Sequence, residues 1–196
     1  MNMTPRQHYR ITRQTVRASV VALALGVVPA VALTTSAAEA APSCGITWGS
    51  LERTSGTPSG AASVTNVRSG RHACYDRLVV DVSGQLKGYS VKYVNSVFTE
   101  GQGAVVPLRG GARLQVVVMA PDHNVNTGRL TYRPANRAEL TNVTGFSTLR
   151  QVASAGSFEG QTTIGLGVRA RLPYRVFVLA GPDTGSRLVI DVAHRW

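Results

Sequence analysis

The residues best suited to chemistry gather between residues 157 and 179, where the sequence reads SFEGQTTIGLGVRARLPYRVFVL. An arginine fork can hold a carboxylate or a phosphate through two parallel hydrogen bonds, and a tyrosine ring can lie on the face of a sugar. This mixture of residue types predicts ligand binding. The candidate binding residues are Glu159, Gln161, Thr163, Arg169, Arg171, Tyr174 and Arg175. The alternative interpretation is a solvated strand edge whose charges prevent aggregation.

The same stretch has the period of a strand with one buried face. Apolar side chains fall on every second residue, at Ile164, Leu166, Val168, Ala170 and Leu172. Between them lie Gly165 and Gly167, followed by Arg169 and Arg171. The alternation places both arginines on one face, but it does not place Arg175. Glycines inside a strand favour close packing over a phosphate-binding loop, which needs a strand-to-helix turn.

Patterns of catalytic or metal-binding residues are absent from the sequence. His72, His123 and His194 are scattered without the spacing of a zinc site, and the serine motif GxSxG does not occur. Glu159 is the most interesting acid, but no second carboxylate is placed beside it, so a turn or a hydrogen bond to a ligand is favoured over general acid work. We therefore predict a protein that is not an enzyme and holds no metal and no cofactor.

The first 40 residues are predicted to be a secretory signal peptide. Four arginines form a basic start, residues 18–33 form an apolar run, and Ala38-Glu39-Ala40 is a small-x-small cleavage signal. The apolar run is shorter than the roughly 20 residues of a membrane span. Cleavage is therefore expected rather than an uncleaved membrane anchor, and no later segment is apolar enough to cross a membrane.

The charge of the chain points to an anionic partner outside the cell. Residues 1–40 carry four of the 21 basic and one of the 10 acidic residues, so their removal leaves 17 against nine and a formal net charge of +8. Arginine outnumbers lysine fifteen to two in the remainder, and arginine favours planar contacts with carboxylates and phosphates. An exported protein of this kind meets anionic envelope polymers or acidic lipids more readily than nucleic acid.

Two cysteines, Cys44 and Cys74, follow the predicted leader. Exported proteins meet an oxidising environment, so a disulfide between them is expected. Closing a loop of about 30 residues stabilises a fold by roughly 3 to 4 kcal/mol in the chain-entropy model. A redox or metal-ligand pair is disfavoured, because the sequence has neither a CxxC spacing nor clustered histidines.

Short β-branched and aromatic runs separated by glycine and proline predict an all-β, two-sheet sandwich with little or no helix. The runs at residues 77–82 and 89–94 are expected to form a hairpin, and the apolar run at 113–120 a central strand. Residues 53–63 are expected to form a flexible loop. Residues 147–153 fit either a strand or a helical turn or two.

One hexapeptide is nearly repeated. RLVVDV, which begins at Arg77, returns as RLVIDV, which begins at Arg187. The repeat suggests two pseudo-equivalent sheets. If the two copies pair antiparallel about their central valines, each arginine lies opposite the aspartate of the other copy, Asp191 or Asp81. Opposite charges across strands contribute about 0.2 to 1 kcal/mol each.

Five segments together carry a family resemblance. They are CGITWGSL, HACYDRLVVDVSG, VPLRGGARLQVVV, SFEGQTTIGLGVRARLPYRVFVL and the terminal SRLVIDVAHRW, of which EGQTTIGLGVRARLP is the most specific. They resemble the AMIN-like domain proteins, related to the AMIN localisation domain of N-acetylmuramoyl-L-alanine amidases, over nearly all of the chain after residue 40. The resemblance implies a two-sheet β-fold that localises envelope proteins, and peptidoglycan binding is attributed to such domains.

The expected organisation is a signal peptide at residues 1–40, an N-terminal segment with a Ser/Thr/Gly-rich loop at residues 41–70, and an AMIN-like β-sandwich domain at residues 71–196. The expected function is that of a non-catalytic, secreted module associated with the cell wall, where it binds peptidoglycan or attached anionic polymers. The alternative is a secreted protein-interaction or inhibitor-like β-domain that holds an envelope protein. A hydrolase with an unrecognised site is the third interpretation.

Overall fold

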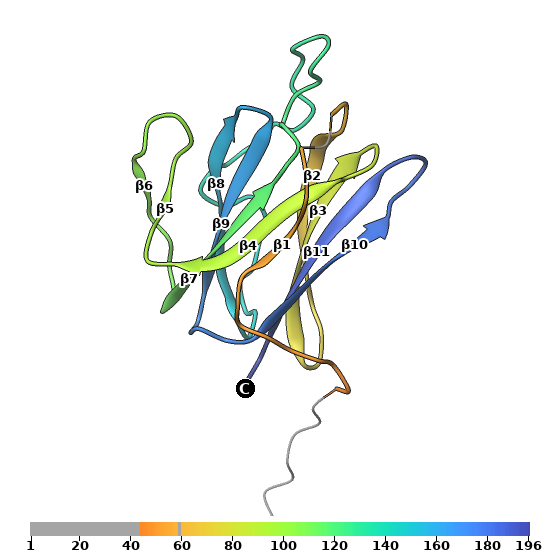
Figure 1. The fold of residues 1–196 in the computed structure, drawn as a ribbon. Helices are drawn as coiled ribbons and strands as arrows, with labels where there is room; N and C mark the ends of the chain where they lie inside the picture. Colours follow the sequence, from red (N-terminus) through yellow and green to blue (C-terminus); the bar gives the residue numbers. More distant parts are fainter. Residues whose placement is uncertain (1–43, 59) are drawn as a thin grey trace, which may run out of the picture. The chain divides into compact units, whose positions relative to one another are not determined.

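The structure is a computed structural model that describes residues 44–58 and 60–196 (Figure 1). One antiparallel sheet, which we call sheet A, consists of β10 (Tyr174–Ala180), β11 (Ser186–Ala193), β3 (Tyr75–Ser83) and β2 (Ser63–Arg71), in that order. Sheet B consists of β1 (Arg53–Gly56), β4 (Gly88–Val94), β7 (Ala112–Val118), β9 (Gln161–Val168) and β8 (Leu149–Phe158), also in order. A separate ribbon pairs β5 (Val97–Phe98) with β6 (Val105–Val106).

Sheets A and B pack face to face, and the core lies between them (Figure 1). Alternate residues of the central strands point inward and are nearly inaccessible; among them are Leu78 and Val80 of β3, Leu114 and Val116 of β7, and Leu188 of β11. Each such side chain contributes about 1.5 to 3 kcal/mol through burial. No helix occurs among the described residues. The predicted all-β sandwich is confirmed, whereas the predicted signal peptide lies outside these residues.

The strand predicted to run from Ile164 to Leu172 is shorter in the structure. β9 ends at Val168, and residues 169–173 cross from sheet B to the start of β10 in sheet A. The strand does not continue to Leu172, because the chain bends where it leaves one sheet for the other, but the predicted alternation does: Ala170 and Leu172 pack against the core, while Arg169 and Arg171 are exposed. The run predicted as a central strand is β7, which lies between β4 and β9 in the middle of sheet B.

The glycines of β9 serve close packing, as predicted. A Cβ on Gly165 would lie 2.8 Å from Leu108 Cδ1, and one on Gly167 would lie 2.1 Å from the carbonyl oxygen of Arg109. The segment after β6 therefore runs directly over the outer face of sheet B. Side chains of this covering layer and of β8 form a small second core, made of Val97, Val106, Leu108, Ala153 and Ala155.

Substituting Gly167 by alanine is expected to lower the free energy of unfolding by about 1 to 3 kcal/mol, the usual cost of overpacking. The new methyl group would meet the backbone of Arg109, which cannot move without displacing the covering segment. Urea denaturation of the purified protein measures the change. Gly70→Ala is the matched control, because its nearest neighbour is His72 Nε2 at 3.8 Å. Equal losses in the two variants would contradict the packing argument.

The two copies of the repeated hexapeptide are neighbours in sheet A, where β11 pairs with β3 antiparallel. The paired residues are the predicted ones: Val189 with Val79, Asp191 with Arg77 and Arg187 with Asp81. The antiparallel pairing is confirmed. The suggestion of two pseudo-equivalent sheets, one for each copy, was wrong, because both copies belong to sheet A.

The expected hairpin of residues 77–82 and 89–94 was also wrong. β3 belongs to sheet A and β4 to sheet B, where β4 pairs with β1 and β7. The connection crosses from one sheet to the other with Leu86 buried, and the backbone N–H of Leu86 donates to Ser186 Oγ at 2.9 Å. The short turn therefore joins two layers instead of two paired strands.

Three further expectations concern short segments. The predicted loop at residues 53–63 contains β1, a strand of sheet B, so a loop over its whole length was wrong. Residues 147–153 take the strand alternative from Leu149 onward, in β8. The disulfide between Cys44 and Cys74 is present, with Cα atoms 6.4 Å apart. It ties the segment before β1 to the start of β3.

Candidate functional site

Two arginines share one carboxylate on the outer face of sheet A. The side chain of Asp191 in β11 is fully buried. Arg77 of β3 donates to it from Nε at 2.6 Å and from Nη2 at 2.9 Å. Arg175 of β10 approaches it through Nε at 2.8 Å and Nη2 at 2.7 Å. The sheet register explains this arrangement, because β11 lies between β10 and β3 and places both arginines opposite Asp191.

Three aromatic rings surround the two guanidinium groups. Arg175 Cζ lies 5.7, 5.5 and 5.0 Å from the ring centroids of Trp48, Tyr75 and Phe177. Arg77 Cζ lies 5.2 Å from the centroid of Tyr75 and 5.6 Å from that of Phe177. These distances are within the range of cation–π attraction. We call this group the arginine–aromatic cluster; it consists of Trp48, Tyr75, Arg77, Arg175, Phe177 and Asp191.

The arginine–aromatic cluster carries one positive charge that Asp191 does not neutralise. Hydrogen bonds to Asp191 raise the pKa of Arg77 above its ordinary value, although burial opposes this, so the guanidinium stays protonated. The side chains of Arg77 and Arg175 remain 23% and 32% exposed. A partly exposed cation among aromatic rings can hold an anionic group while a ring lies against a sugar.

Arg169 and Arg171 lie on the crossover between β9 and β10. Arg169 Nη2 donates to the carbonyl oxygen of His194 at 2.6 Å. Arg171 Cζ lies 5.0 Å from the ring centroid of Tyr93, and its carbonyl oxygen accepts a hydrogen bond from Trp196 Nε1 at 3.1 Å. Both arginines are exposed, and Trp196 is 75% exposed. A second group of exposed arginines and aromatic rings therefore forms at this end of the sandwich.

Glu159 and Gln161 lie at the opposite end of β9 from these arginines. Glu159 has a φ of 48° and Gly160 a φ of 78°, and the two form the turn that joins β8 to β9. The distance from Gln161 to Arg169 along an extended strand is roughly 26 Å. The structure therefore does not bring Glu159 and Gln161 together with the predicted arginines.

Thr163 and Tyr174 are buried, at 1% and 0% exposure. Thr163 Oγ1 donates to Glu100 Oε1 at 2.5 Å. The hydroxyl of Tyr174 lies 2.7 Å from the carbonyl oxygen of Leu51 and 2.8 Å from that of Val91. Their prediction as ligand contacts is corrected, because each side chain is enclosed by the protein and its hydroxyl already has protein partners.

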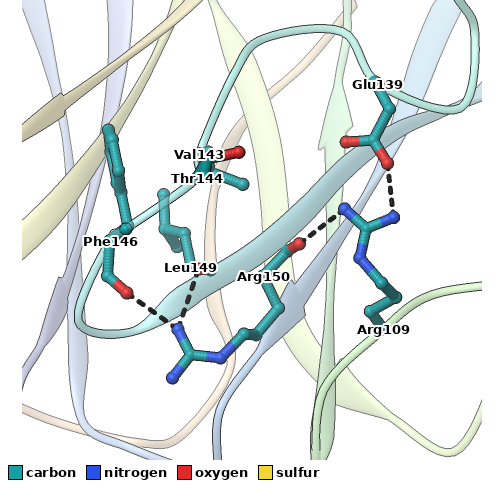
Figure 2. Close-up of a pocket in the computed structure, with 8 residues that line it drawn as sticks. Arg109, Glu139, Val143, Thr144, Phe146, Leu149 and Arg150 are labelled. Carbon is teal, nitrogen blue, oxygen red and sulfur yellow. Dashed lines mark hydrogen bonds and ion pairs between the residues drawn. The ribbon is translucent and has the colours of Figure 1, made fainter.

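A cavity of about 290 Å³ lies beside the start of β8. Figure 2 shows that its two arginines point to protein acceptors. Arg109 pairs with Glu139 and donates to the carbonyl oxygen of Arg150 at 2.9 Å. Arg150 donates to the carbonyl oxygens of Phe146 at 2.9 Å and Leu149 at 3.0 Å. Because these guanidinium groups already donate to loop carbonyls, the cavity has fewer free donors for a bound anion than the arginine–aromatic cluster has.

The histidines occupy separate places in the fold. His194 Nε2 lies 3.1 Å from Asp76 Oδ1, His123 pairs with Asp122, and the ring of His72 stacks on Tyr75. Among residues 44–58 and 60–196 no group of three or more His, Cys, Asp or Glu side chains is placed to hold a metal ion. Within the same residues, no helix has the length and apolarity to cross a membrane.

The model of the AMIN-like domain matches residues 62–194, a span that includes every strand from β2 to β11. The chain belongs to the AMIN-like domain family. No curated protein matches it. The match begins after Trp48, so this AMIN-like chain adds a ring from outside the matched residues to the arginine–aromatic cluster.

Sequence reasoning proposed only Arg175 of the cluster in this AMIN-like chain as a binding residue; it missed the other five members, Trp48, Tyr75, Arg77, Phe177 and Asp191. Part of the signal was present, since alternation places Phe177 on the same face as Arg175. The predicted pairing of the two hexapeptides also put Arg77 opposite Asp191. Adding a hairpin between β10 and β11 would have brought Arg175 to the same carboxylate. No local pattern points to Trp48, which depends on the path of the segment after the disulfide.

Proposed function

We propose that this AMIN-like chain is an exported, non-catalytic module that binds the bacterial cell wall, either peptidoglycan or its attached anionic polymers. Membership of the family supports a role in the envelope. The disulfide between Cys44 and Cys74 fits an oxidising, extracellular setting. The strong excess of arginine supports an anionic partner.

The arginine–aromatic cluster is the observation that carries this proposal. A sugar ring lies well against a partly exposed ring such as Trp48 or Tyr75. Arg175 uses Nε and Nη2 for Asp191, which leaves Nη1 to bind a carboxylate or a phosphate of the same polymer. Asp191 fixes the position of Arg175, so little side-chain entropy is lost when the polymer binds.

The exposed Arg169 and Arg171 supply a second contact region. They lie on the crossover that leads directly into β10 and hence to Arg175. A polymer carries its anionic groups at repeated intervals, so two separate basic regions on one protein bind it more tightly than one region alone.

Changing both Arg169 and Arg171 to alanine is expected to reduce retention of the purified protein on purified sacculi several-fold at about 50 mM salt, and to have little effect at about 500 mM, where exposed charges are screened. The matched control changes Arg129 and Arg133, two exposed arginines of the loop after β7, and removes the same charge. Trp48→Ala is expected to lower retention at both salt concentrations, because stacking is not screened by salt.

The outcome depends on which part of the wall is bound. Retention that persists on sacculi stripped of anionic polymers identifies peptidoglycan, and retention that disappears identifies the anionic polymer. The proposal is rejected if neither preparation retains the protein at low salt. Equal losses from the crossover variant and from its charge-matched control would reject the assigned contact region.

A further inference from the structure

Three of the four outer strands of the two sheets have protected edges. Along β8, Ser154 N donates to Arg137 O and Leu140 N donates to Val152 O, each at 2.7 Å. β2 is covered at its start, where Val64 N donates to Pro121 O at 2.7 Å; farther along it has a bulge between Val64 and Asn66 and the charged residues Arg68 and Arg71. β1 has only four residues, RTSG, all exposed and none of them apolar. Covered, short or polar edges do not readily pair with other chains.

Within the part of the chain that the structure describes, the fourth outer strand, β10, is covered only at its two ends. At its start, Tyr174 and Gly49 exchange hydrogen bonds from N–H to carbonyl oxygen at 2.6 and 3.3 Å. At its end, the carbonyl oxygen of Ala180 accepts from the guanidinium of Arg187. The bonds between Tyr174 and Gly49 lie on the side away from β11, whereas Arg187 reaches the carbonyl oxygen of Ala180 from β11 itself. The backbone groups that face this free edge therefore start with Tyr174 and end with Ala180.

The alternation of an antiparallel ladder identifies the open positions between these ends. Because Tyr174 points its N–H and carbonyl away from β11, so do Val176 and Val178, while Arg175 and Phe177 bond to β11. Ala193 N donates to Pro173 O at 2.9 Å, which fixes the same phase independently. The open edge thus offers the donors and acceptors of Val176 and Val178, together with the N–H of Ala180 at its end.

The side chains along this edge are also available. Val178 and Leu179 are 40% and 41% exposed. Among the described residues they are the only two large exposed apolar side chains that are adjacent in the sequence. Residues 176–180 contain no proline and no charge, the devices that usually keep an edge strand from pairing.

We propose that β10 pairs with β10 of a second copy of this chain, antiparallel across a two-fold axis at Phe177. Val176 of each copy then lies opposite Val178 of the other, and each such pair exchanges two hydrogen bonds. Phe177 faces Phe177 of the second copy at a non-hydrogen-bonded position, where side chains are closest. Arg175, which Asp191 already holds, lies opposite Leu179.

A second copy of the chain fits this edge because its own β10 has an open stretch of the same length, bounded by the same two residues. The room between Tyr174 and Ala180 is short, and a longer strand would collide with the segment at Gly49. In the two-fold register, Tyr174 of one copy lies opposite Ala180 of the other, where both backbone groups of Tyr174 and the carbonyl oxygen of Ala180 already have partners. The open groups of Val176 and Val178 therefore meet open groups of the second copy, as an isologous interface requires.

The two-fold axis is perpendicular to sheet A, so the pairing joins two four-stranded sheets with their outer faces on the same side. On the proposed function, it sets two arginine–aromatic clusters side by side for one repeating polymer, which raises avidity. The pairing itself does not depend on that function. The proposed pairing and the proposed wall binding also differ in their salt dependence. Salt screens the repulsion between two basic copies and favours the pairing, whereas it weakens wall binding.

The decisive test is cross-linking of single-cysteine variants under mild oxidation, read on a non-reducing gel. Facing residues at a non-hydrogen-bonded pair have Cα atoms about 4.5 Å apart, within the range of a disulfide, so Phe177→Cys is expected to form covalent dimers. Val178→Cys is the control, because two copies of residue 178 lie diagonally, about 9 Å apart by the spacings of a sheet. A mixture of Val176→Cys and Val178→Cys proteins is expected to cross-link as a pair.

Sedimentation supplies the second measurement. The wild-type protein is expected to show a concentration-dependent dimer that strengthens with salt. Val178→Pro removes an outward N–H and leaves the ladder to β11 intact, so the variant is expected to stay monomeric with an unchanged melting temperature. A wild-type protein that remains monomeric at high salt, cross-linking of Val178→Cys as fast as Phe177→Cys, or a Val178→Pro variant that still dimerises would each overturn the proposal.

Discussion

Replacing Asp191 by alanine is expected to lower the free energy of unfolding by about 3 to 5 kcal/mol, the cost of breaking a buried ion pair. The carboxylate is fully buried, and both Arg77 and Arg175 donate to it. Without it, two partly buried guanidinium groups repel each other with no counter-charge between them. Urea denaturation at neutral pH measures the loss.

Asp81→Ala is the matched control, because Asp81 occupies the same place in the other copy of the hexapeptide. It pairs with Arg68 of β2 at 2.8 Å, and that arginine is 48% exposed. Exposed ion pairs contribute only about 0 to 1 kcal/mol. The two substitutions should therefore differ by several-fold in their effect. Comparable losses would show that burial of Asp191 adds nothing to the strength of its ion pairs.

Much of the strand pattern was readable because apolar alternation and turn residues are local. The pairing of the two hexapeptides was also predictable, since opposite charges at their ends favour one register. The connection through Leu86 was not. A glycine-containing turn of four residues between two strands looks the same whether the strands pair or lie in different layers, and only the burial of Leu86 between the sheets decides it.

The candidate site was predicted less well, for a related reason. The alternation of β9, continued past Pro173, puts Tyr174 in the core and Arg175 on the outside, as observed, but it does not show that the chain changes sheets at residues 169–173. That change places Arg175 on the outer face of sheet A, beside Arg77 and Asp191, instead of beside the residues of β9. Trp48 reaches the same face from a segment far away in the sequence. A site assembled from three strands and the segment before β1 has no single sequence pattern.

Tyr174→Phe is expected to cost about 1 kcal/mol of unfolding free energy at neutral pH, the contribution of one hydrogen bond, and to change the response to alkali. Burial raises the pKa of Tyr174 to about 12, while a tyrosine in an unfolded chain titrates near pH 10. Between these values the unfolded chain loses a proton that the folded protein keeps, so stability falls as pH rises, by roughly 2 to 3 kcal/mol in total.

The variant lacks this titration, so its stability should fall less steeply than that of the wild type between pH 10 and 12, and the two curves should approach or cross. Stability curves at a series of pH values measure the difference, and the remaining tyrosines are common to both proteins. Parallel curves would contradict a buried, protonated Tyr174. Retention on sacculi at neutral pH should be unchanged, because the enclosed hydroxyl bonds to Leu51 and Val91. A loss of retention without a loss of stability would instead indicate that Tyr174 contacts the ligand.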